Sequence, residues 1–223
     1  EVGQGSGLVG QLQSRTDPNA AVPRLTYDVF GRVTGIRQPG ADWSNPATEK
    51  YAYTDSPAPL AVKHSLRDDQ NGDTSSAATY LDDWAYYDGL GQVIQTQREA
   101  ASGSQSIIAS TQYHPLGGVK QQNVPYFYAA AGGTYRTPDW NQPKILSAYD
   151  ALGRVTQTTN PDATARYYYY VDRRSSVKDE NNHAVVREAD AFGRLVQVEE
   201  YTGTNPWTLY ATTRYDYDVR DGL

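Results

Sequence analysis

The sequence predicts an all-β protein built of repeated antiparallel β-hairpins that form one continuous curved or spiralling sheet. The first observation behind this prediction is a pattern of eight residues, Tyr-Asp-x-x-Gly-Arg/Gln-aliphatic-x, which recurs along the chain and indicates a turn followed by a strand. The second is that no segment shows sustained helical periodicity with caps. The third is that neither face of the strand expected at residues 194–201 is consistently apolar, which favours a single sheet wetted on both sides over a tight sandwich.

The parts of the pattern have separate structural roles. Asp at the first position of a type I turn can accept a hydrogen bond from a nearby backbone N–H, and the Gly can take a positive φ in a bulge. The Tyr ends the incoming strand, and the Arg or Gln starts the outgoing one. We expect these residues to build hairpin corners without a catalytic role. The structural repeat residues are Tyr27, Asp28, Gly31, Arg32, Tyr87, Asp88, Gly91, Tyr149, Asp150, Gly153, Arg154, Asp190, Gly193 and Arg194, and a weaker copy spans residues 113–119.

The first part of the chain is expected to lead into the repeats. Residues 1–23 are rich in Gly, Gln and turn residues, which indicates a lead-in strand or arm. The hairpin array occupies residues 24–223, with a continuation beyond the C-terminus left open. Its first outgoing strand, at residues 32–38, turns at Pro39-Gly40 and returns at 50–54, and a strand at 60–66 follows. Gly31 and Gly91 are 60 residues apart, so one corner between them lacks the signature.

The later repeats follow the same order of outgoing strand, turn and returning strand. A longer excursion is expected between residues 118 and 144. The pair Asn181-Asn182 tolerates the positive φ that a tight hairpin turn needs. Further strands are expected at residues 92–98, 107–113, 144–149, 154–159, 164–171, 175–180, 184–188, 194–201 and 207–217.

Composition excludes several classes of function. The formal net charge of −6 and the absence of a Lys/Arg cluster argue against nucleic acid or an anionic membrane as partner. No apolar run reaches the length of a membrane span, so we expect no membrane insertion. The absence of Cys excludes disulfides and thiolate sites. The chain begins with Glu1 and has no Met, which we interpret as a section of a longer protein without a visible targeting segment.

The recurring residues resemble the RHS or YD-repeat family, named after the Tyr-Asp of the motif. Its repeat reads Tyr-Asp-x-x-Gly-Arg-Leu/Val-Thr and is followed by a Pro-containing turn; the steps from Gly31 to Pro39 and from Gly153 to Pro161 both span 8 residues. The resemblance covers about residues 24–223. It implies a sheet of hairpins that spirals around a hollow interior, so that this chain is a segment of a β-shell.

The family includes the B and C subunits of bacterial toxin complexes, polymorphic RHS toxins and animal teneurins. In the toxins the shell encloses a C-terminal effector, and in teneurins it is part of a cell-surface adhesion assembly. This sequence departs from the self-cleaving Asp-Pro-x-Gly segment of the family, because Asp17-Pro18 is followed by Asn19-Ala20. The resemblance therefore implies no autoproteolysis for this section.

No catalytic, cofactor-binding or metal-binding residues are predicted, and we expect no enzyme activity. The Gly-x-Gly-x-x-Gly match at residues 5–10 lacks the strand and helix of a dinucleotide site. The acidic run at 68–73 does not fit the register of a calcium loop, which leaves an irregular Ca²⁺ site as the alternative to a solvated turn. The histidines His64, His114 and His183 are too scattered for a metal cage and are expected at the surface or in turns.

Tyr167 and Tyr169 are the speculative ligand contacts, because tyrosines on one strand face can stack on sugar rings. The alternative is that they only stack on neighbouring strands.

The predicted function is a structural section of a large secreted or cell-surface RHS/YD-repeat protein, whose shell wall encloses or presents an effector. Its expected partners are neighbouring repeats of the same polypeptide and an enclosed effector. The alternatives are an adhesion module that binds a glycan or a cell-surface protein, and a fibre subunit that binds copies of itself through open sheet edges.

Overall fold

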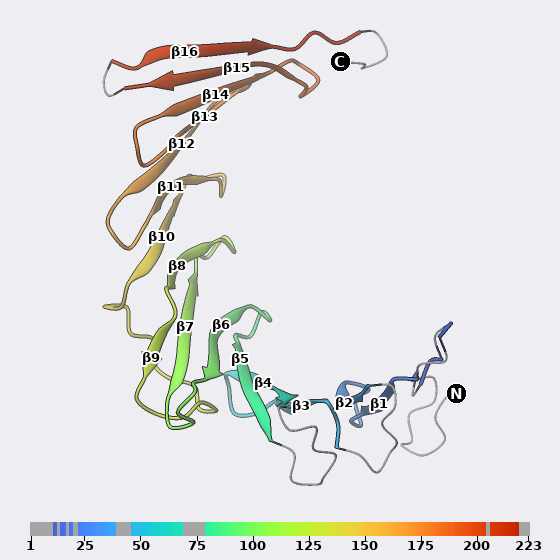
Figure 1. The fold of residues 1–223 in the computed structure, drawn as a ribbon. Coiled ribbons are helices and arrows are strands. Elements are labelled where there is room, and N and C mark those ends of the chain that lie inside the picture. The colour runs from blue at the N-terminus through green and yellow to red at the C-terminus, as the bar shows by residue number, and fades with distance from the viewer. Residues whose placement is uncertain are drawn as a thin grey trace. The chain divides into compact units, whose positions relative to one another are not determined.

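The structure is a computed structural model and describes residues 11–12, 14–16, 18–19, 22–38, 46–68, 79–203 and 206–218. These residues form strands and no helix, which confirms the all-β class (Figure 1). The strands are β1 (Arg24–Tyr27), β2 (Val33–Arg37), β3 (Glu49–Thr54), β4 (Leu60–Arg67), β5 (Tyr80–Tyr87), β6 (Val93–Glu99), β7 (Ser106–Tyr113), β8 (Val119–Asn123), β9 (Tyr126–Tyr128), β10 (Lys144–Tyr149), β11 (Val155–Thr159), β12 (Ala165–Val171), β13 (Arg174–Lys178), β14 (Ala184–Ala189), β15 (Leu195–Thr202) and β16 (Thr208–Arg214).

The strands pair in the order in which they occur along the chain. They form a 16-stranded sheet that runs from β1 to β16, with β9 off this path and paired to β7. Neighbouring strands are antiparallel, as short connections require. The predicted array of hairpins is thereby confirmed.

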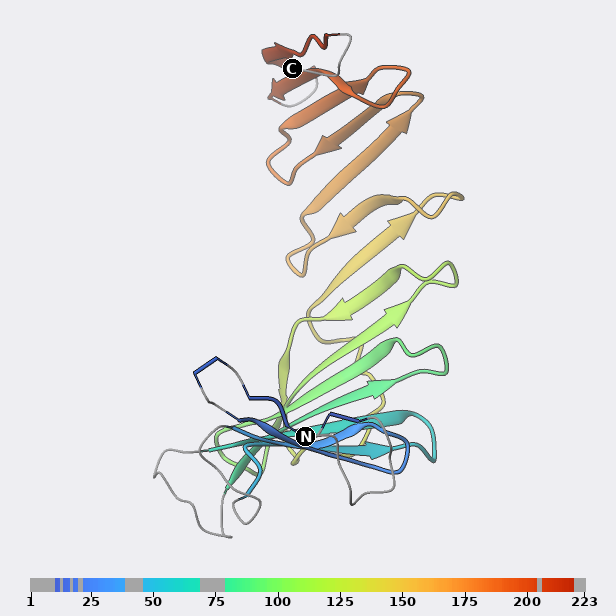
Figure 2. The same cartoon turned by 90° about the vertical axis from the view of Figure 1, so that its right-hand side faces the viewer.

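The chain divides into two compact units. The first unit comprises residues 1–110 and 125–138, and the second comprises residues 111–124 and 139–223. Strand β7 contributes its first part to the first unit and its last part to the second. Within each unit the corners that carry the Tyr-Asp motif lie at the same edge of the strands, because an even number of strands separates one corner from the next (Figure 2).

Several strand bounds agree closely with the sequence, and others differ for local reasons. The strand expected at residues 144–149 is β10. The corner without the signature joins β3 to β4, where Pro57 and Pro59 take the place of the motif. The strands β8 and β9 lie where we expected only a long excursion. Their short runs, Val-Lys-Gln-Gln-Asn and Tyr-Phe-Tyr, show too little alternation to be recognised.

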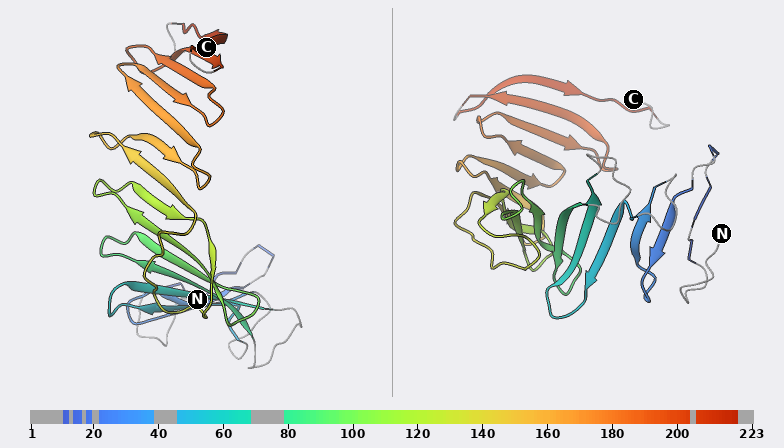
Figure 3. Two further views of the ribbon diagram at one scale, coloured as in Figure 1. Left: turned by 90° about the vertical axis from the view of Figure 1, so that its left-hand side faces the viewer. Right: turned by 60° about the horizontal axis from the view of Figure 1, so that its bottom comes forward.

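The first unit contains a small core that is largely polar. The segment 129–137 crosses one face of strands β5 to β7, which Figure 3 shows from two further sides. Beneath it the ring of Tyr86 contacts the ring of Tyr135 edge-on, with centroids 5.6 Å apart. Trp84 leaves no room for a side chain at Gly132, because a Cβ there would lie 2.4 Å from the indole. The largest fully buried side chains are Ile108, Gln95, Gln97, Ser106 and Ser110.

Two glutamines hold this segment with their side-chain amides. The amide nitrogen of Gln95 donates to the backbone carbonyl of Arg136 at 2.8 Å, and its oxygen accepts from the Arg136 backbone N–H at 3.0 Å. The amide of Gln97 likewise donates to the Thr134 carbonyl at 2.7 Å and accepts from the Gly133 N–H at 3.0 Å. The two glutamines therefore bind the segment as a neighbouring strand would, through alternating donors and acceptors.

Some predictions fall outside the described residues. These are the Gly-rich stretch at 5–10, the Pro39-Gly40 turn, residues 69–73 of the acidic run and the last residues, 219–223.

Candidate functional site

Each motif corner is held by its aspartate. At the clearest corner, Oδ1 of Asp150 accepts hydrogen bonds from the backbone N–H groups of Leu152 and Arg154, at 2.9 and 3.0 Å. Its Oδ2 accepts a further hydrogen bond from Nε of Arg154, at 2.7 Å. The backbone N–H of Gly153 donates to the carbonyl of Asp150 at 3.0 Å and closes the turn. One carboxylate thus satisfies two backbone donors and fixes the arginine that directly precedes β11.

The same contacts recur at other corners. Asp28 accepts from the backbone and Nε of Arg32, and Asp190 accepts from the backbone and Nε of Arg194. At the corner of Asp88 the equivalent residue is Gln92, so the backbone contact is kept at 2.9 Å and no ion pair forms with it. The carboxylate contact to the backbone is thus kept without the arginine, which adds a charge-assisted contact where it is present.

The motif glycines have the backbone conformation that favours Gly. Their φ angles are 80° at Gly31, 77° at Gly91, 78° at Gly153 and 83° at Gly193. The strand register shifts by one residue at each of these corners, which identifies a bulge. Asn182, in the tight turn between β13 and β14, has φ 65°.

A contact that sequence reasoning missed links three tyrosines, each to the corner before it. The hydroxyl of Tyr149 donates to the carbonyl of Val119 at 2.8 Å, which is the residue that begins the outgoing strand of the preceding corner. Tyr53 makes the same bond to Val33, and Tyr217 makes it to Leu195, both at 2.8 Å. Tyr149 therefore ends its own strand, β10, and also ties two corners together.

The motif arginine completes this link by lying over a tyrosine ring. The guanidinium carbon is 4.2 Å from the ring centroid between Arg32 and Tyr53, and 4.8 Å between Arg194 and Tyr217. The weak copy at residues 113–119 has Gly118 in this position. There the Tyr149 ring packs directly on the backbone, since a Cβ at Gly118 would lie 2.6 Å from it. The sequence carries no regular spacing that signals this link, and only the pairing of strands reveals the acceptor.

The corner contacts change the acidity of the motif aspartates. The hydrogen bond from the Arg154 backbone N–H, followed by that from its side chain, holds the pKa of Asp150 below its ordinary value against some burial. At Asp28 and Asp190 burial raises the pKa, but the hydrogen bonds from Arg32 and Arg194 outweigh it, and the net pKa is lowered. These carboxylates are therefore charged at neutral pH.

The two tyrosines singled out as ligand contacts lie on β12 in different surroundings. The ring of Tyr167 receives the ammonium of Lys178 at 4.8 Å, and it is partly buried. Tyr169 is 47% exposed. They share a strand face by alternation, but neither lines the concave surface described below.

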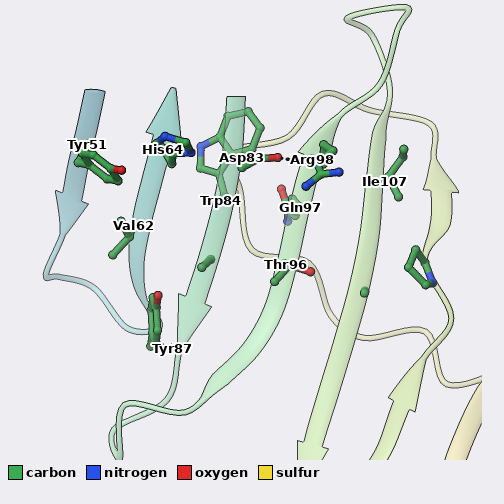
Figure 4. Close-up of a pocket in the computed structure, with 13 residues that line it drawn as sticks. Tyr51, Val62, His64, Asp83, Trp84, Tyr87, Thr96, Gln97, Arg98 and Ile107 are labelled. Carbon is green, nitrogen blue, oxygen red and sulfur yellow. Dashed lines mark hydrogen bonds and ion pairs between the residues drawn. The ribbon is translucent and has the colours of Figure 1, made fainter. Parts of the chain in front are cut away.

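That surface, here called the hollow, lies on the face of the first unit opposite to segment 129–137 and has a volume of about 630 Å³. The strand register explains its form. One row of long side chains crosses strands β3 to β7 and consists of Tyr51, His64, Asp83, Arg98 and Ile107 (Figure 4). The adjacent row has short side chains at its centre, namely Val62, Ala85, Thr96 and Ala109. The low row next to the tall one produces the depression.

Polar contacts fix the long side chains of the hollow. The rings of Tyr51 and His64 stack with centroids 4.8 Å apart. Both side chains bind Oε2 of Glu49, the tyrosine hydroxyl at 2.8 Å and Nε2 of the histidine at 3.3 Å. Burial, followed by the bond to Glu49, raises the pKa of Tyr51 to about 12. Nε of Arg98 donates to Oδ1 of Asp83 at 2.9 Å.

Sequence reasoning did not bring these residues together. His64 lies within β4, in the strand expected at residues 60–66, and its side chain is 31% exposed in the hollow. Within the described part of the chain, no group of three or more His, Cys, Asp or Glu side chains could hold a metal ion. The same residues include no helix with the length and hydropathy of a membrane span.

Comparisons with known proteins place this fold. Residues 61–170 match the model of a protein family described as a domain of unknown function, DUF6443. No curated protein sequence matches the chain. Among solved structures, the crystal structure of TcdB2-TccC3 is similar with a TM-score of 0.72 and 16% sequence identity, over 93% of this chain and 13% of that chain. A structure of the Photorhabdus luminescens Tc holotoxin pore gives a TM-score of 0.73 at 14% identity, over 94% of this chain and 16% of that chain.

At such identities the likeness concerns the fold alone. The chain has the fold of a stretch of TcdB2-TccC3 and spans only 13% to 16% of the length of the chains it matches.

Proposed function

We propose that this chain is a non-enzymatic section of shell wall in a large secreted or cell-surface protein of the RHS/YD-repeat type. The observation that carries the proposal is the chain-order pairing of the strands with motif corners at one edge, in a fold shared with TcdB2-TccC3 over 93% of the chain. In this role the wall encloses or presents an effector, and its partners are neighbouring repeats of the same polypeptide.

Strand pairing and the corner contacts are suited to a thin shell wall. A strand between two paired neighbours has its backbone donors and acceptors satisfied without a thick core. The corner aspartates reverse the chain, and the tyrosine hydroxyls tie successive corners together. Few apolar side chains are fully buried, which agrees with a sheet that is wetted or contacted on both faces. Function then resides in the continuity of the sheet.

Limited proteolysis of the polypeptide that contains this section tests the proposal. If the section is a wall, an enclosed segment resists a protease that digests the same segment expressed alone. Replacement of Asp28, Asp150 and Asp190 by Ala should weaken three corners and open the enclosed segment to cleavage. Replacement of the exposed pair Arg174 and Glu188 by Ala is the control and should leave protection unchanged. Equal digestion of the unaltered polypeptide and the isolated segment would refute enclosure.

The exposed ring of Tyr169 favours a second candidate, an adhesion module that contacts a glycan or a cell-surface protein through Tyr167 and Tyr169. Binding to a glycan array that falls in the Tyr169→Ala variant would support this role. An unchanged signal would assign the binding elsewhere.

A further inference from the structure

We propose that the hollow of the first unit binds a short neutral saccharide whose sugar rings lie across strands β4 to β7. This inference does not depend on the shell-wall function. The site is formed by side chains of one compact unit and would be the same in a wall, an adhesion module or an isolated domain.

The size and shape of the hollow suit such a ligand. Its volume of about 630 Å³ lies within the range of ligand pockets in proteins. The low row runs across the strands, so the depression is elongated in that direction. Since neighbouring strands are about 4.8 Å apart, four strands offer a length of roughly 15 Å, enough for two or three linked sugar rings.

The aromatic side of the hollow, formed by Tyr51 and His64, is ordered before any ligand binds. Tyr51 is held by its stacking on His64 and by the bond from its hydroxyl to Glu49. A side chain fixed in this way loses little conformational freedom on binding, which lowers the entropic cost. Tyrosine rings also offer the apolar body on which the C–H face of a pyranose can pack.

The ion pair of the hollow offers groups that recognise hydroxyls. Asp83 and Arg98 share one hydrogen bond, from Nε to Oδ1. Within the described part of the chain, Oδ2 of Asp83 and the terminal nitrogens of Arg98 have no hydrogen-bond partner. One acceptor and a fork of donors thus lie side by side, and neighbouring hydroxyls of a sugar ring can use both. Figure 4 shows the side chains of Asp83 and Arg98 next to each other.

The low row of short side chains forms the floor of the hollow and favours a saccharide over an extended peptide. Val62, Ala85 and Ala109 offer no hydrogen bonds from their side chains, and the hydroxyl of Thr96 is the polar group among them. A peptide lying across them would leave backbone N–H and C=O groups without partners. A sugar ring instead turns C–H groups to the floor and hydroxyls to the walls. The carboxylate of Glu49 beside the aromatic pair disfavours an anionic sugar.

Titration of the chain with neutral linear trisaccharides tests the inference. Maltotriose, cellotriose and chitotriose are added separately, and binding is followed by saturation-transfer NMR and calorimetry. At least one should bind with a dissociation constant of about 1 mM or tighter. Asp83→Asn and Tyr51→Ala should each weaken that binding about tenfold. Ala85→Leu fills the floor without removing any polar contact and should abolish it.

Matched controls come from the second unit. Glu188 forms an exposed ion pair with Arg174 at 2.8 Å, and Glu188→Gln should leave the affinity unchanged. Tyr169→Ala removes an exposed tyrosine outside the hollow and should also have no effect. Circular dichroism of every variant checks that the sheet is intact. Since Ala85→Leu adds atoms to an open hollow, its fold should survive even if Tyr51→Ala is unstable.

Three results would overturn the proposal. One is the absence of binding by all three trisaccharides at about 10 mM, ten times the expected dissociation constant. Another is binding that falls equally in the hollow variants and in their controls. The third is saturation of the hollow by unfolded carboxymethylated casein without any saccharide binding, which would identify a polypeptide site. Protease protection of an enclosed segment would be unaffected by all three results, so failure here leaves the shell-wall proposal standing.

Discussion

Gln95 and Gln97 show how single residues can replace a missing strand. Each places a donor and an acceptor on the covered face of β6, with the spacing of an i, i+2 pair. Backbone groups of Gly133, Thr134 and Arg136 pair with these amides, and Gln97 also donates to the oxygen of Gln95 at 2.8 Å. A segment without regular structure is thereby hydrogen-bonded to the sheet at four backbone groups. Such a buried network is stable only while all its members are satisfied.

Removal of one amide should therefore be costly. We expect Gln97→Leu to lower the free energy of unfolding by about 2–4 kcal/mol, because the Gly133 N–H and the Thr134 carbonyl lose their partners in a buried site. Gln112→Leu is the control, since Gln112 is exposed and should change the stability by less than about 0.5 kcal/mol. Urea denaturation measures both. Equal effects would mean that the network contributes nothing specific.

Removal of two tyrosine hydroxyls should have opposite effects on the free energy of unfolding. Tyr149→Phe removes the bond to Val119 and should cost about 1 kcal/mol of unfolding free energy. Tyr86→Phe should be neutral or stabilising, because the Tyr86 hydroxyl is buried without a hydrogen-bond partner among the described residues. Thermal or urea denaturation of the two variants compares them directly. A larger loss for Tyr86→Phe than for Tyr149→Phe would contradict the role given to the link between corners.

At the scale of the element, the corner between β5 and β6 shows whether a glycine is needed for its backbone conformation or for lack of room for a side chain. Gly89 and Gly91 both have room for a Cβ, but only Gly91 has a positive φ, of 77°. Gly91→Ala should cost about 1 kcal/mol through backbone strain, whereas Gly89→Ala should be neutral or slightly stabilising. Denaturation midpoints of the two variants decide the matter. A stable Gly91→Ala variant would show that the bulge is not required.

The corner aspartates also predict the response to acid. The folded-state pKa of Asp150 lies below its usual value of 3.8, so its contribution to stability is complete above that pH and is lost as the pH falls through the lower, folded value. We expect the unfolding free energy to drop on acidification below about pH 4. Asp150→Asn should be less stable at neutral pH and show a smaller acid-induced drop. An identical pH profile for the variant would contradict this assignment.

Local sequence predicts some of these structural features and not others. The corners follow from Asp, Gly and their spacing, and β10 follows from its flanking turn and motif, since each depends on a few adjacent residues. The acceptor of Tyr149 and the row from Tyr51 to Arg98 depend on which strands pair and in which register. The strand β9 and the glutamine network arise from pairing across tens of residues, and short polar runs carry no periodic signal for them.

At the scale of the whole molecule, each unit is stabilised more by contacts between neighbouring strands than by a central apolar core. Among the described residues few apolar side chains are fully buried, and Ile108 is the largest of these. Strand pairing, corner ion pairs and tyrosine links are repeated instead, so each hairpin depends mainly on its neighbours. A protein of this kind can be lengthened by adding repeats, which is what an enclosing wall requires.

The most direct measurement is a cryo-electron microscopy reconstruction of the polypeptide that contains this section. The shell-wall proposal predicts a hollow particle in which strands β1 to β16 form part of the wall, paired at both ends with further repeats. A reconstruction that shows these strands packed against a solid core, or exposed at the end of a fibre, would contradict it.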